Sequence, residues 1–303
     1  MSEAASLIWE EVRCNLCGAD DGRTLYERPM SEESLKNPRD FLATTDQFGD
    51  YGRIIRCRHC GLAYTNPRLA FDRILQSYTQ TEDTEYAEEA ESRSINGYFT
   101  LAAIRRHASH GRLLDIGCAH GFLLNAARVY FDVQGIELSA HARGYAKKQL
   151  GLEVGATPLR DAKFPDAHFD VVTMVDVIEH VTDPLADLKE IRRILKPGGI
   201  LYLVTPDLSG LAAKLLRGRW WGLRPAHLYY FDPKTMSAML EKAGFETLET
   251  RSFGKIFTYG YWLSRIQNYP RLFSGPIGWD VNSFNLHEKF LYLDTRDSMQ
   301  VIA

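Results

Sequence analysis

The sequence predicts an α/β protein with a mainly parallel sheet, preceded by a small cysteine-rich domain. Three observations support this prediction. Short apolar runs alternate with helical patterns from Arg112 onward, two Cys-x-x-Cys-Gly pairs stand near the N-terminus, and a small-residue turn joins the first of these apolar runs to a helix. The chain has 303 residues, 45% hydrophobic and 25% charged, which excludes the disordered and fibrous classes and leaves room for about two domains.

Composition and the N-terminal sequence also disfavour membrane-spanning, secreted and nucleic-acid-binding proteins. Mean hydropathy is −0.27 and no long uncharged apolar run occurs, so we expect no membrane-spanning helix. The N-terminus lacks a basic segment followed by an apolar core, and without such a secretory signal we expect a cytoplasmic protein. The formal net charge of −3 gives no overall attraction to nucleic acid.

The elements follow one another in a regular order. Residues 71–110 are expected to form a helical linker or lid. Apolar runs that predict strands cover residues 113–116, 133–136, 169–175, 200–204, 245–250 and 299–303. Helical patterns cover residues 122–130, 140–150, 185–195 and 234–242. Strands that alternate with helices in this way predict βαβ units.

Residues 1–70 are expected to form a small zinc-ribbon-like domain. Cys14 and Cys17 make one Cys-x-x-Cys pair and Cys57 and Cys60 the other, with 39 residues between the pairs. Two such turns can bring four thiolates into a tetrahedron around Zn²⁺, and a closed site of this kind is structural rather than catalytic. Reduced thiols without metal and an iron–sulfur cluster are the alternatives. We expect the adjacent His59 to be exposed rather than a ligand.

A nucleoside site is predicted where the first strand of the α/β region ends. That strand enters a small-residue turn that ends at Gly121, so a ligand can approach the backbone closely. Glu137 ends the next strand, 20 positions after Gly117, where a carboxylate can accept hydrogen bonds from a ribose. A dinucleotide fingerprint would need glycine and a small residue where Ala119 and Phe122 stand, and no G-x-x-x-x-G-K-[ST] motif occurs.

This region resembles class I S-adenosylmethionine-dependent methyltransferases. Their first motif, D-x-G-x-G-x-G, matches at Asp115, Gly117, Ala119 and Gly121, with alanine in place of one glycine. Further matches follow in the family's order, namely the ribose-binding acid Glu137, the segment 164–172, the D-x-x-E-H-V-x-D-P motif at 176–184 and the L-K-P-G-G turn at 195–199. The resemblance covers residues 112–205. It implies a Rossmann-like seven-stranded methyltransferase sheet with helices on both faces, in which residues 299–303 supply an antiparallel last strand.

The resemblance also implies the cofactor and its site. Residues 111–303 would form the methyltransferase domain, which binds S-adenosylmethionine. Its expected contacts come from the turn, the following acid and three later segments, namely Asp115, Gly117, Cys118, Ala119, His120, Gly121, Phe122, Glu137, Leu138, Asp161, Ala162, Val175 and Asp176. Asp161 and Ala162 would lie near the adenine, and Tyr78 and Tyr86 would close over the cofactor.

His227 is the first catalytic candidate. The stretch 225–231 resembles the H-E-H-L-x-Y-F segment of NDP-sugar C-methyltransferases, which also carry an N-terminal zinc-binding domain. The second histidine of that segment is their base and matches His227, while Pro225 and Ala226 replace the preceding H-E. Residues 256–295 would be an insertion that forms part of the acceptor side.

Glu179 and His180 are the second candidates. With Asp176 they stand at i, i+3 and i+4, which share one face of a helix. A similar segment occurs in ubiquinone-pathway O-methyltransferases and small-RNA methyltransferases. In some members it holds a divalent cation that a later histidine completes, here His227, and in many others it packs at a helix start without metal. His120 is a third candidate, which would cap the turn or contact the cofactor.

These matches predict methyl transfer by in-line displacement to a hydroxyl or an acidic carbon of a small molecule or glycan precursor, with a histidine base. An RNA or protein methyltransferase docking through the zinc ribbon is one alternative, and a non-catalytic cofactor-binding scaffold is another. Seven Lys and Arg against eleven Asp and Glu precede Cys57, which disfavours nucleic acid. A basic and aromatic cluster would bind a sugar, phosphate or base, or form a packed lid; it consists of Arg217, Arg219, Trp220, Trp221 and Arg224. The oligomeric state is not predicted.

Overall fold

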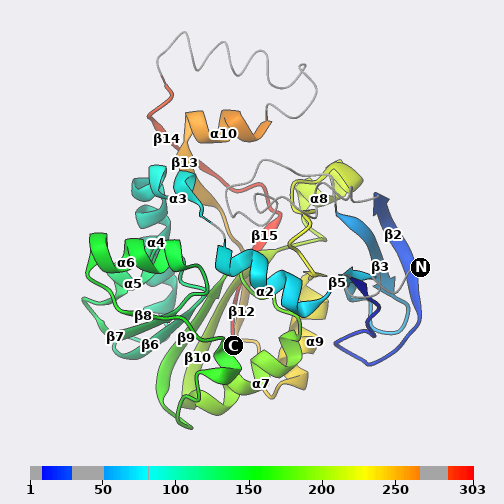
Figure 1. Ribbon diagram of the computed structural model, residues 1–303, viewed down its shortest axis with the longest axis horizontal. Coiled ribbons are helices and arrows are strands. Elements are labelled where there is room, and N and C mark those ends of the chain that lie inside the picture. Colours follow the sequence, from blue (N-terminus) through cyan, green and yellow to red (C-terminus); the bar gives the residue numbers. More distant parts are fainter. Residues whose placement is uncertain (1–8, 29–50, 81, 267–285) are drawn as a thin grey trace.

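The computed structural model describes residues 9–28, 51–80, 82–266 and 286–303 (Figure 1). A large twisted sheet and a smaller N-terminal sheet lie side by side, with helices packed around the large one. The insertion expected at 256–295 falls partly outside these residues. Within the described ranges, no helix combines the length and apolar character needed to cross a membrane.

The large sheet has seven strands, as predicted. Their order is β12-β15-β10-β9-β6-β7-β8, and β15 runs antiparallel to both of its neighbours, which confirms the expected reversed last strand. The bounds of the strands are β6 (Gly111–Ile116), β7 (Phe131–Ile136), β8 (Val154–Gly155), β9 (Phe169–Val175), β10 (Leu195–Pro206), β12 (Glu249–Ser252) and β15 (Ser298–Ile302).

Helices cover both faces of this sheet because neighbouring residues on a strand point to opposite sides. Leu113 and Val171 pack against α4, α5 and α6, whereas Leu114 and Val172 pack against α7 and α9 on the other face (Figure 1). Strands buried on both faces appear in the sequence as continuous apolar runs. The helices of this region are α5 (Phe122–Ala127), α6 (Ala140–Leu150), α7 (Pro184–Ile194), α8 (Leu211–Leu216) and α9 (Pro233–Lys242).

The segment before the large sheet is helical, and a hairpin from the end of the chain packs on it. The helices are α2 (Phe71–Gln80), α3 (Thr84–Glu88) and α4 (Ala90–Ile104). The hairpin pairs β13 (Lys255–Thr258) with β14 (Phe290–Leu293), and α10 (Tyr259–Ile266) follows β13. Asn96 of α4 exchanges two hydrogen bonds with the backbone of Ile256, at 2.8 and 2.9 Å, so the hairpin is fixed to α4.

The N-terminal sheet includes a strand from much later in the chain. Its order is β11-β4-β3-β2, from β2 (Gly22–Arg28), β3 (Gly52–Cys57), β4 (Ala63–Thr65) and β11 (Tyr229–Tyr230). A separate pair joins β1 (Trp9–Glu10) to β5 (Arg68–Leu69). Because β11 pairs antiparallel with β4, the small sheet is continuous with the chain that follows α8.

Some elements differ from the sequence prediction. The strand expected at 245–250 begins only at Glu249, because Phe245 N still bonds to Leu240 O of α9 and pairing with β15 starts at Leu248. Helix α5 ends at Ala127, where a turn leads directly into β7. The unpredicted strands β8, β11, β13 and β14 have two to four residues each, too few to display a periodicity.

Candidate functional site

The turn between β6 and α5 allows close approach to the backbone. Gly117 has a φ of 68°, and a Cβ there would lie 2.6 Å from Val177 Cγ2, so only glycine fits. Gly117 N donates to Ile136 O at 2.8 Å, which ties the turn to the end of β7. Ala119 also has a positive φ, 46°, which strains an L-residue, at the position where the motif has glycine.

Glu137 closes this turn from the end of β7. Its Oε2 accepts from Ala119 N at 3.0 Å and its Oε1 accepts from Ser139 N at 2.8 Å. Each carboxylate oxygen has a second lone pair, so Glu137 can also accept from the hydroxyls of a ligand beside the turn. Asp115 lies inside the sheet, where its Oδ1 accepts from Thr173 Oγ1 at 2.6 Å and burial raises its pKa to about 7.

His120 lies in an aromatic cluster next to the turn. Its ring stacks on Tyr86 with 4.7 Å between centroids and meets Tyr145 edge-on at 4.6 Å. The side chain is 2% exposed, and among the described residues neither ring nitrogen has a hydrogen-bond partner. Burial lowers the pKa of His120 to about 4, so the ring is neutral at neutral pH. Tyr86 thus lies beside the turn, whereas the side chain of Tyr78 is outside the described residues.

The other predicted cofactor residues are less closely grouped. The Cys118 thiol faces the sheet, because a Cβ on Gly135 would lie 2.8 Å from its sulfur. Asp161 is exposed at the end of the short 3-10 helix η3 (Leu159–Asp161). Buried or half-buried side chains stand at the remaining positions, namely Phe122, Leu138, Ala162, Val175 and Asp176.

Glu179, His180 and His227 form an acid–histidine cluster at the carboxyl edge of the large sheet. One donor atom from each lies within 4.8 Å of the other two. Glu179 is 1% exposed, and its Oε2 accepts from Thr205 Oγ1 at 2.9 Å, whereas its Oε1 has no hydrogen-bond partner among the described residues. Burial raises the pKa of Glu179, so the carboxylate charge needs a cation or a donor facing it.

The two histidines of the cluster are held as the same tautomer. His180 Nδ1 lies 3.0 Å from Ala226 O, and His227 Nδ1 lies 2.8 Å from Gly222 O. A carbonyl only accepts, so each Nδ1 carries the proton and each Nε2 carries a lone pair in the neutral ring. The ring centroids are 4.7 Å apart, and burial lowers the pKa of both histidines, that of His180 to about 4. The cluster therefore gathers two imidazole lone pairs and one carboxylate.

Two side chains beside the cluster were not predicted. Lys255 Nζ, from β13, lies 2.5 Å from Asp176 Oδ2, and Asp176 has a strained φ of 54°. Lys255 belongs to no motif, so no sequence signal marks it. Thr205 lies next to the carboxyl end of a predicted strand, where a polar residue is a recognisable signal.

The backbone just before β11 connects the cluster to the N-terminal sheet. Thr65, in β4, donates its N–H to Leu228 O at 2.9 Å and its hydroxyl to His227 O at 3.0 Å. On the other side, Leu228 N donates to Glu179 O at 2.8 Å. Glu179 and His227 are therefore positioned by the same short stretch of backbone.

Two further side chains of the N-terminal region reach the loop after Glu179. Arg68 is 8% exposed; it donates to Glu10 Oε1 at 2.7 Å and to Thr182 O at 2.8 Å. Asn15 donates to Asp183 Oδ1 at 2.8 Å. Because Asp183 caps α7 by accepting from Ala186 N, Asn15 and Arg68 together fix the loop that carries the acid–histidine cluster.

The basic and aromatic cluster before His227 is partly packed. Trp220 is 1% exposed, and its Nε1 donates to Asp297 Oδ2 at 2.6 Å. A buried indole with a satisfied N–H is a core residue. Arg217 and Arg219, on either side of Gly218, are exposed.

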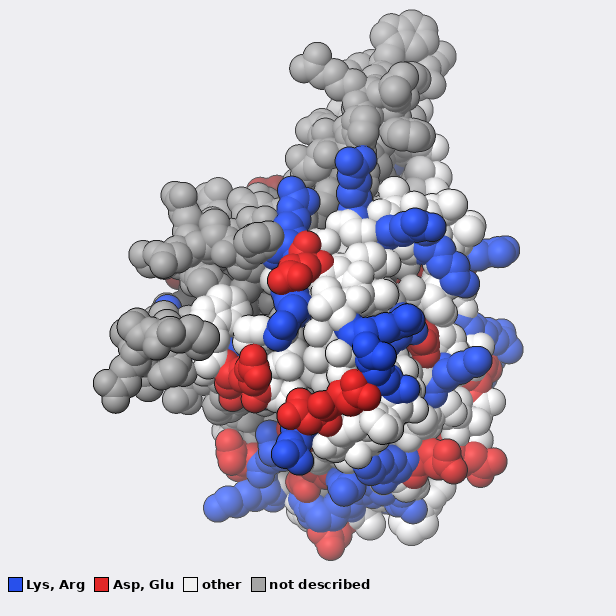
Figure 2. Space-filling view, turned by 90° about the vertical axis from the view of Figure 1, so that its right-hand side faces the viewer, with Lys and Arg blue, Asp and Glu red and all other residues white. Residues whose placement is uncertain are grey.

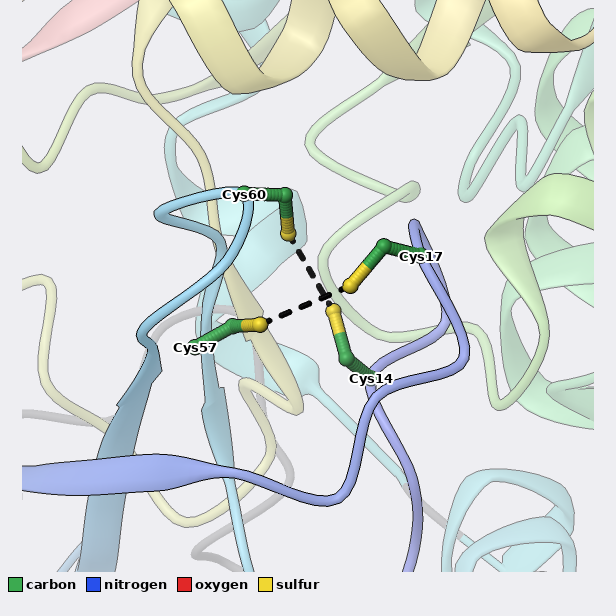
Figure 3. Close-up of side chains that lie close together, drawn as sticks. All are labelled: Cys14, Cys17, Cys57 and Cys60. Carbon is green, nitrogen blue, oxygen red and sulfur yellow. Dashed lines mark hydrogen bonds between the residues drawn. The ribbon is translucent and has the colours of Figure 1, made fainter.

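The four cysteines of the N-terminal region lie together. Figure 3 shows their sulfur atoms pointing toward a common centre, and all four lie within 4.8 Å of one another. The sulfurs of Cys14 and Cys60 are 3.4 Å apart, and those of Cys17 and Cys57 are 3.5 Å apart. Sulfurs about 2.3 Å from a tetrahedral Zn²⁺ are about 3.8 Å from one another, so the donor set fits that ion. His59 is exposed as predicted, 3.6 Å from an Asp21 oxygen.

Comparisons with known proteins identify the family. The family model described as "Methyltransferase domain" matches residues 86–250, more than half of the chain. The chain belongs to this methyltransferase-domain family. A ubiquinone biosynthesis O-methyltransferase of Cereibacter sphaeroides is 31% identical over 164 residues, 50% of this chain and 66% of that relative. A probable S-adenosylmethionine-dependent methyltransferase of Mycolicibacterium smegmatis is 30% identical over 150 residues, 48% of this chain and 56% of that relative.

A solved structure supports the same fold. A methyltransferase from Archaeoglobus fulgidus, described as dependent on S-adenosylmethionine, aligns with a TM-score of 0.51 at 17% identity, covering 73% of this chain and 99% of that one. The methyltransferase match at 86–250 contains the turn between β6 and α5, Glu137 and the acid–histidine cluster. The four cysteines and strands β2, β3 and β4 precede the match, so these strands are an addition to the matched domain.

Proposed function

We propose that this methyltransferase moves the methyl group of S-adenosylmethionine to a hydroxyl or an acidic carbon of a small molecule or glycan precursor. The supporting observation is that the cofactor turn and the acid–histidine cluster share one edge of the sheet. Strand β6 ends in the turn, and its neighbour β9 ends just before Glu179. Ligands of open α/β sheets bind at this carboxyl edge, so cofactor and acceptor would meet there.

The cofactor would lie across the turn. Glu137 would accept from the ribose hydroxyls, and the backbone from Gly117 to Gly121 would contact the methionyl part. His120, buried with two ring nitrogens that lack partners among the described residues, would bond a polar group of the cofactor. Asp161 and Ala162 would lie on the adenine side.

Methyl transfer from a sulfonium needs alignment more than activation, because the donor is already charged. His227 Nε2 would take the proton of the acceptor as the acceptor oxygen or carbon bonds to the methyl group and the methyl–sulfur bond breaks. The Nδ1 bond to Gly222 O keeps that lone pair on Nε2. Glu179, within the same cluster, would stabilise the imidazolium that forms, and His180 beside it would help to orient the acceptor.

The same three side chains also suit a divalent cation. Two imidazole lone pairs and one carboxylate are a common ligand set, and the unpartnered Glu179 Oε1 is a buried acceptor that a cation would satisfy. A cation held by Glu179, His180 and His227 would acidify an acceptor hydroxyl. The two roles of His227 exclude one another, because a metal-bound Nε2 has no lone pair for a proton.

The four cysteines would hold a structural Zn²⁺. Four thiolates leave no open coordination position, so the ion would link the turn at Cys14 and Cys17 to the end of β3 and the turn that follows it. Thiols that stay reduced for metal binding fit the expected cytoplasmic location.

An RNA acceptor has less support than a small molecule. Figure 2 views the molecule from the side of the N-terminal sheet, and there Lys and Arg are interspersed with Asp, Glu and uncharged residues. A surface that follows a phosphate backbone needs a continuous excess of positive charge. The described part of this face has no such continuous basic surface.

Calorimetry combined with a methyl-transfer assay tests the proposed function. We expect S-adenosylmethionine to bind and NAD⁺ not to bind, because Ala119 and Phe122 replace the dinucleotide pattern. Radiolabelled methyl groups should then reach a member of a panel of hydroxylated aromatics, sugars and glycan precursors. Failure to bind S-adenosylmethionine would contradict the proposal, and tight binding without transfer to that panel or to RNA would favour a scaffold.

A further inference from the structure

A cavity lies apart from the acid–histidine cluster, between the N-terminal sheet and the chain that follows β10. Its volume is about 420 Å³, which is in the range of small-molecule sites. Tyr26 of β2 and Arg56 of β3 form one wall. Ser209, Lys214 and Arg217, in and around α8, form the opposite wall. The proposed methyl transfer assigns no role to any of these side chains.

Three cations line this cavity. Within the described ranges, no carboxylate lies within 4.0 Å of the charged groups of Arg56, Lys214 or Arg217 to form an ion pair. The Nε of Arg56 is buried and has no hydrogen-bond partner there. A buried donor without an acceptor costs free energy, and a bound anion would remove that cost.

The nearby carboxylates are engaged elsewhere. Asp232 lines the cavity, but its Oδ1 caps α9 by accepting from Thr235 N and Oγ1, both at 2.9 Å. Asp207 precedes the α8 wall, and its Oδ1 accepts from the backbone N and the hydroxyl of Ser209, both at 2.7 Å. These bonds hold one oxygen of each carboxylate at its own turn. The charge of Lys214 still acts on Asp207, but among the described residues no carboxylate forms an ion pair with the three cations, so they can contact a ligand.

We propose that this cavity binds the phosphate group of a phosphorylated small molecule. Guanidinium groups match phosphate oxygens with paired N–H bonds, and a lysine ammonium adds a point charge. The ring of Tyr26 and the apolar side chains of Leu208 and Ala213 provide a wall for the uncharged part of the ligand. The inference goes beyond the methyl transfer and does not depend on it.

Two sources of such a phosphate are compatible with the position. The cavity follows the carboxyl end of β10, and Thr205 near that end bonds Glu179 of the acid–histidine cluster. The phosphate therefore belongs either to the methyl acceptor itself or to a separate molecule that binds alongside it. Both sources present the same chemistry to Arg56, Lys214 and Arg217.

Titration of the 303-residue protein with pyrophosphate tests the site, and binding is measured by calorimetry and by phosphorus NMR. Wild type should bind it, and Lys214→Gln, on the exposed side of α8, should weaken binding at least about tenfold, as should Arg56→Gln. Lys234→Gln is the matched control, because Lys234 is exposed on neighbouring α9 but does not line the cavity. Circular dichroism checks that Arg56→Gln, within β3, still folds.

The outcomes separate clearly. No binding by wild type, or equal binding by wild type, Lys214→Gln and Lys234→Gln, would overturn the proposal. S-adenosylmethionine affinity is measured in the same samples. A protein that binds S-adenosylmethionine but not pyrophosphate contradicts the phosphate site and leaves the proposed methyl transfer standing. Once an acceptor is known, pyrophosphate that competes with it assigns the phosphate to the acceptor. Pyrophosphate that binds without competing with the acceptor assigns the phosphate to a separate molecule. Competition and its absence both support the phosphate site.

Discussion

The cofactor turn is made by one short stretch of chain, whereas the acid–histidine cluster is assembled from distant ones. The turn uses β6, α5 and the end of β7, which follow one another directly. The cluster needs the loop after β9, the end of β10 and the segment before β11, and β11 is held by strand β4 of the N-terminal sheet. The comparison teaches that the N-terminal sheet supports the acid–histidine cluster, although the family match at 86–250 includes only its strand β11.

The largest expected effect is on the cofactor half. Glu137→Ala removes the carboxylate that we expect to bind the ribose and that now bonds Ala119 N. Calorimetry should find S-adenosylmethionine affinity lowered by about 100-fold or more, since two charge-assisted hydrogen bonds are lost. Glu153→Ala is the control, because Glu153 is exposed and pairs only with Lys147 on the surface. Unchanged affinity in Glu137→Ala would refute the ribose assignment.

On the acceptor half, His227→Ala should lower turnover by about 10²- to 10⁴-fold, the usual contribution of a general base. Cofactor affinity should stay within about twofold, because His227 lies apart from the turn. Measurements with and without added Mg²⁺ or Mn²⁺ distinguish a base from a cation ligand, since only the ligand role makes wild-type turnover depend on the ion. Wild-type turnover in His227→Ala would eliminate both roles.

Arg68 links the two sheets, and its loss should have a smaller effect. Arg68→Met removes the donor to Glu10 and one of the two donors to Thr182 O, the other being the hydroxyl of Tyr229, which should lower the free energy of unfolding by about 2 kcal/mol in urea denaturation. Arg58→Met serves as the comparison: its side chain is 61% exposed beside Asp21, and the change should stay below about 0.5 kcal/mol. Equal effects of the two substitutions would argue against Arg68 as a structural link.

The last expected effect is a pH dependence of stability. The folded state holds the pKa of His120 at about 4, below its ordinary value of 6.5. Between these values the unfolded chain binds a proton that the folded chain does not, so stability falls as pH falls from 6.5 toward 4, by at most about 3 kcal/mol for this residue. His120→Phe should reduce the loss seen by urea denaturation between pH 7 and pH 4.5. If His120→Phe loses as much stability as wild type over this pH range, the titrating group is not His120.

The turn after β6 is easier to predict from sequence than the acid–histidine cluster, because it is formed by one short stretch of chain. Strands such as β6 and β9, buried on both faces, appear as apolar runs, and the turn with Glu137 lies within about 20 residues of chain. The hydrogen bond between Thr65 and His227 spans 162 positions, and local patterns carry no information about such a pairing. His227 and Glu179 were therefore recognised individually by resemblance, but their shared support from β4 was not.

Two further features that the sequence did not predict, the start of β12 and the position of Lys255, also have physical causes. Strand β12 begins late because Phe245 still belongs to the end of α9. Lys255 reaches Asp176 from the hairpin of β13 and β14, which Asn96 bonds to α4, a contact between segments 160 positions apart. Short strands and tertiary contacts of this kind have no periodic signal in the sequence.

The central claim is that the N-terminal sheet supports the acid–histidine cluster but not the turn that would bind the cofactor. Hydrogen exchange on a Cys57→Ser variant tests this claim most directly. Loss of this sulfur should release the expected zinc and loosen β3, β4 and β11. The predicted result is faster exchange at 226–231 and 179–183, with exchange at 113–124 and 131–137 unchanged. His59→Ala, which removes an exposed neighbour outside the cluster, should leave all four segments as in wild type. Unchanged exchange at 226–231 in Cys57→Ser, or equal loss of protection in both halves, would contradict the account.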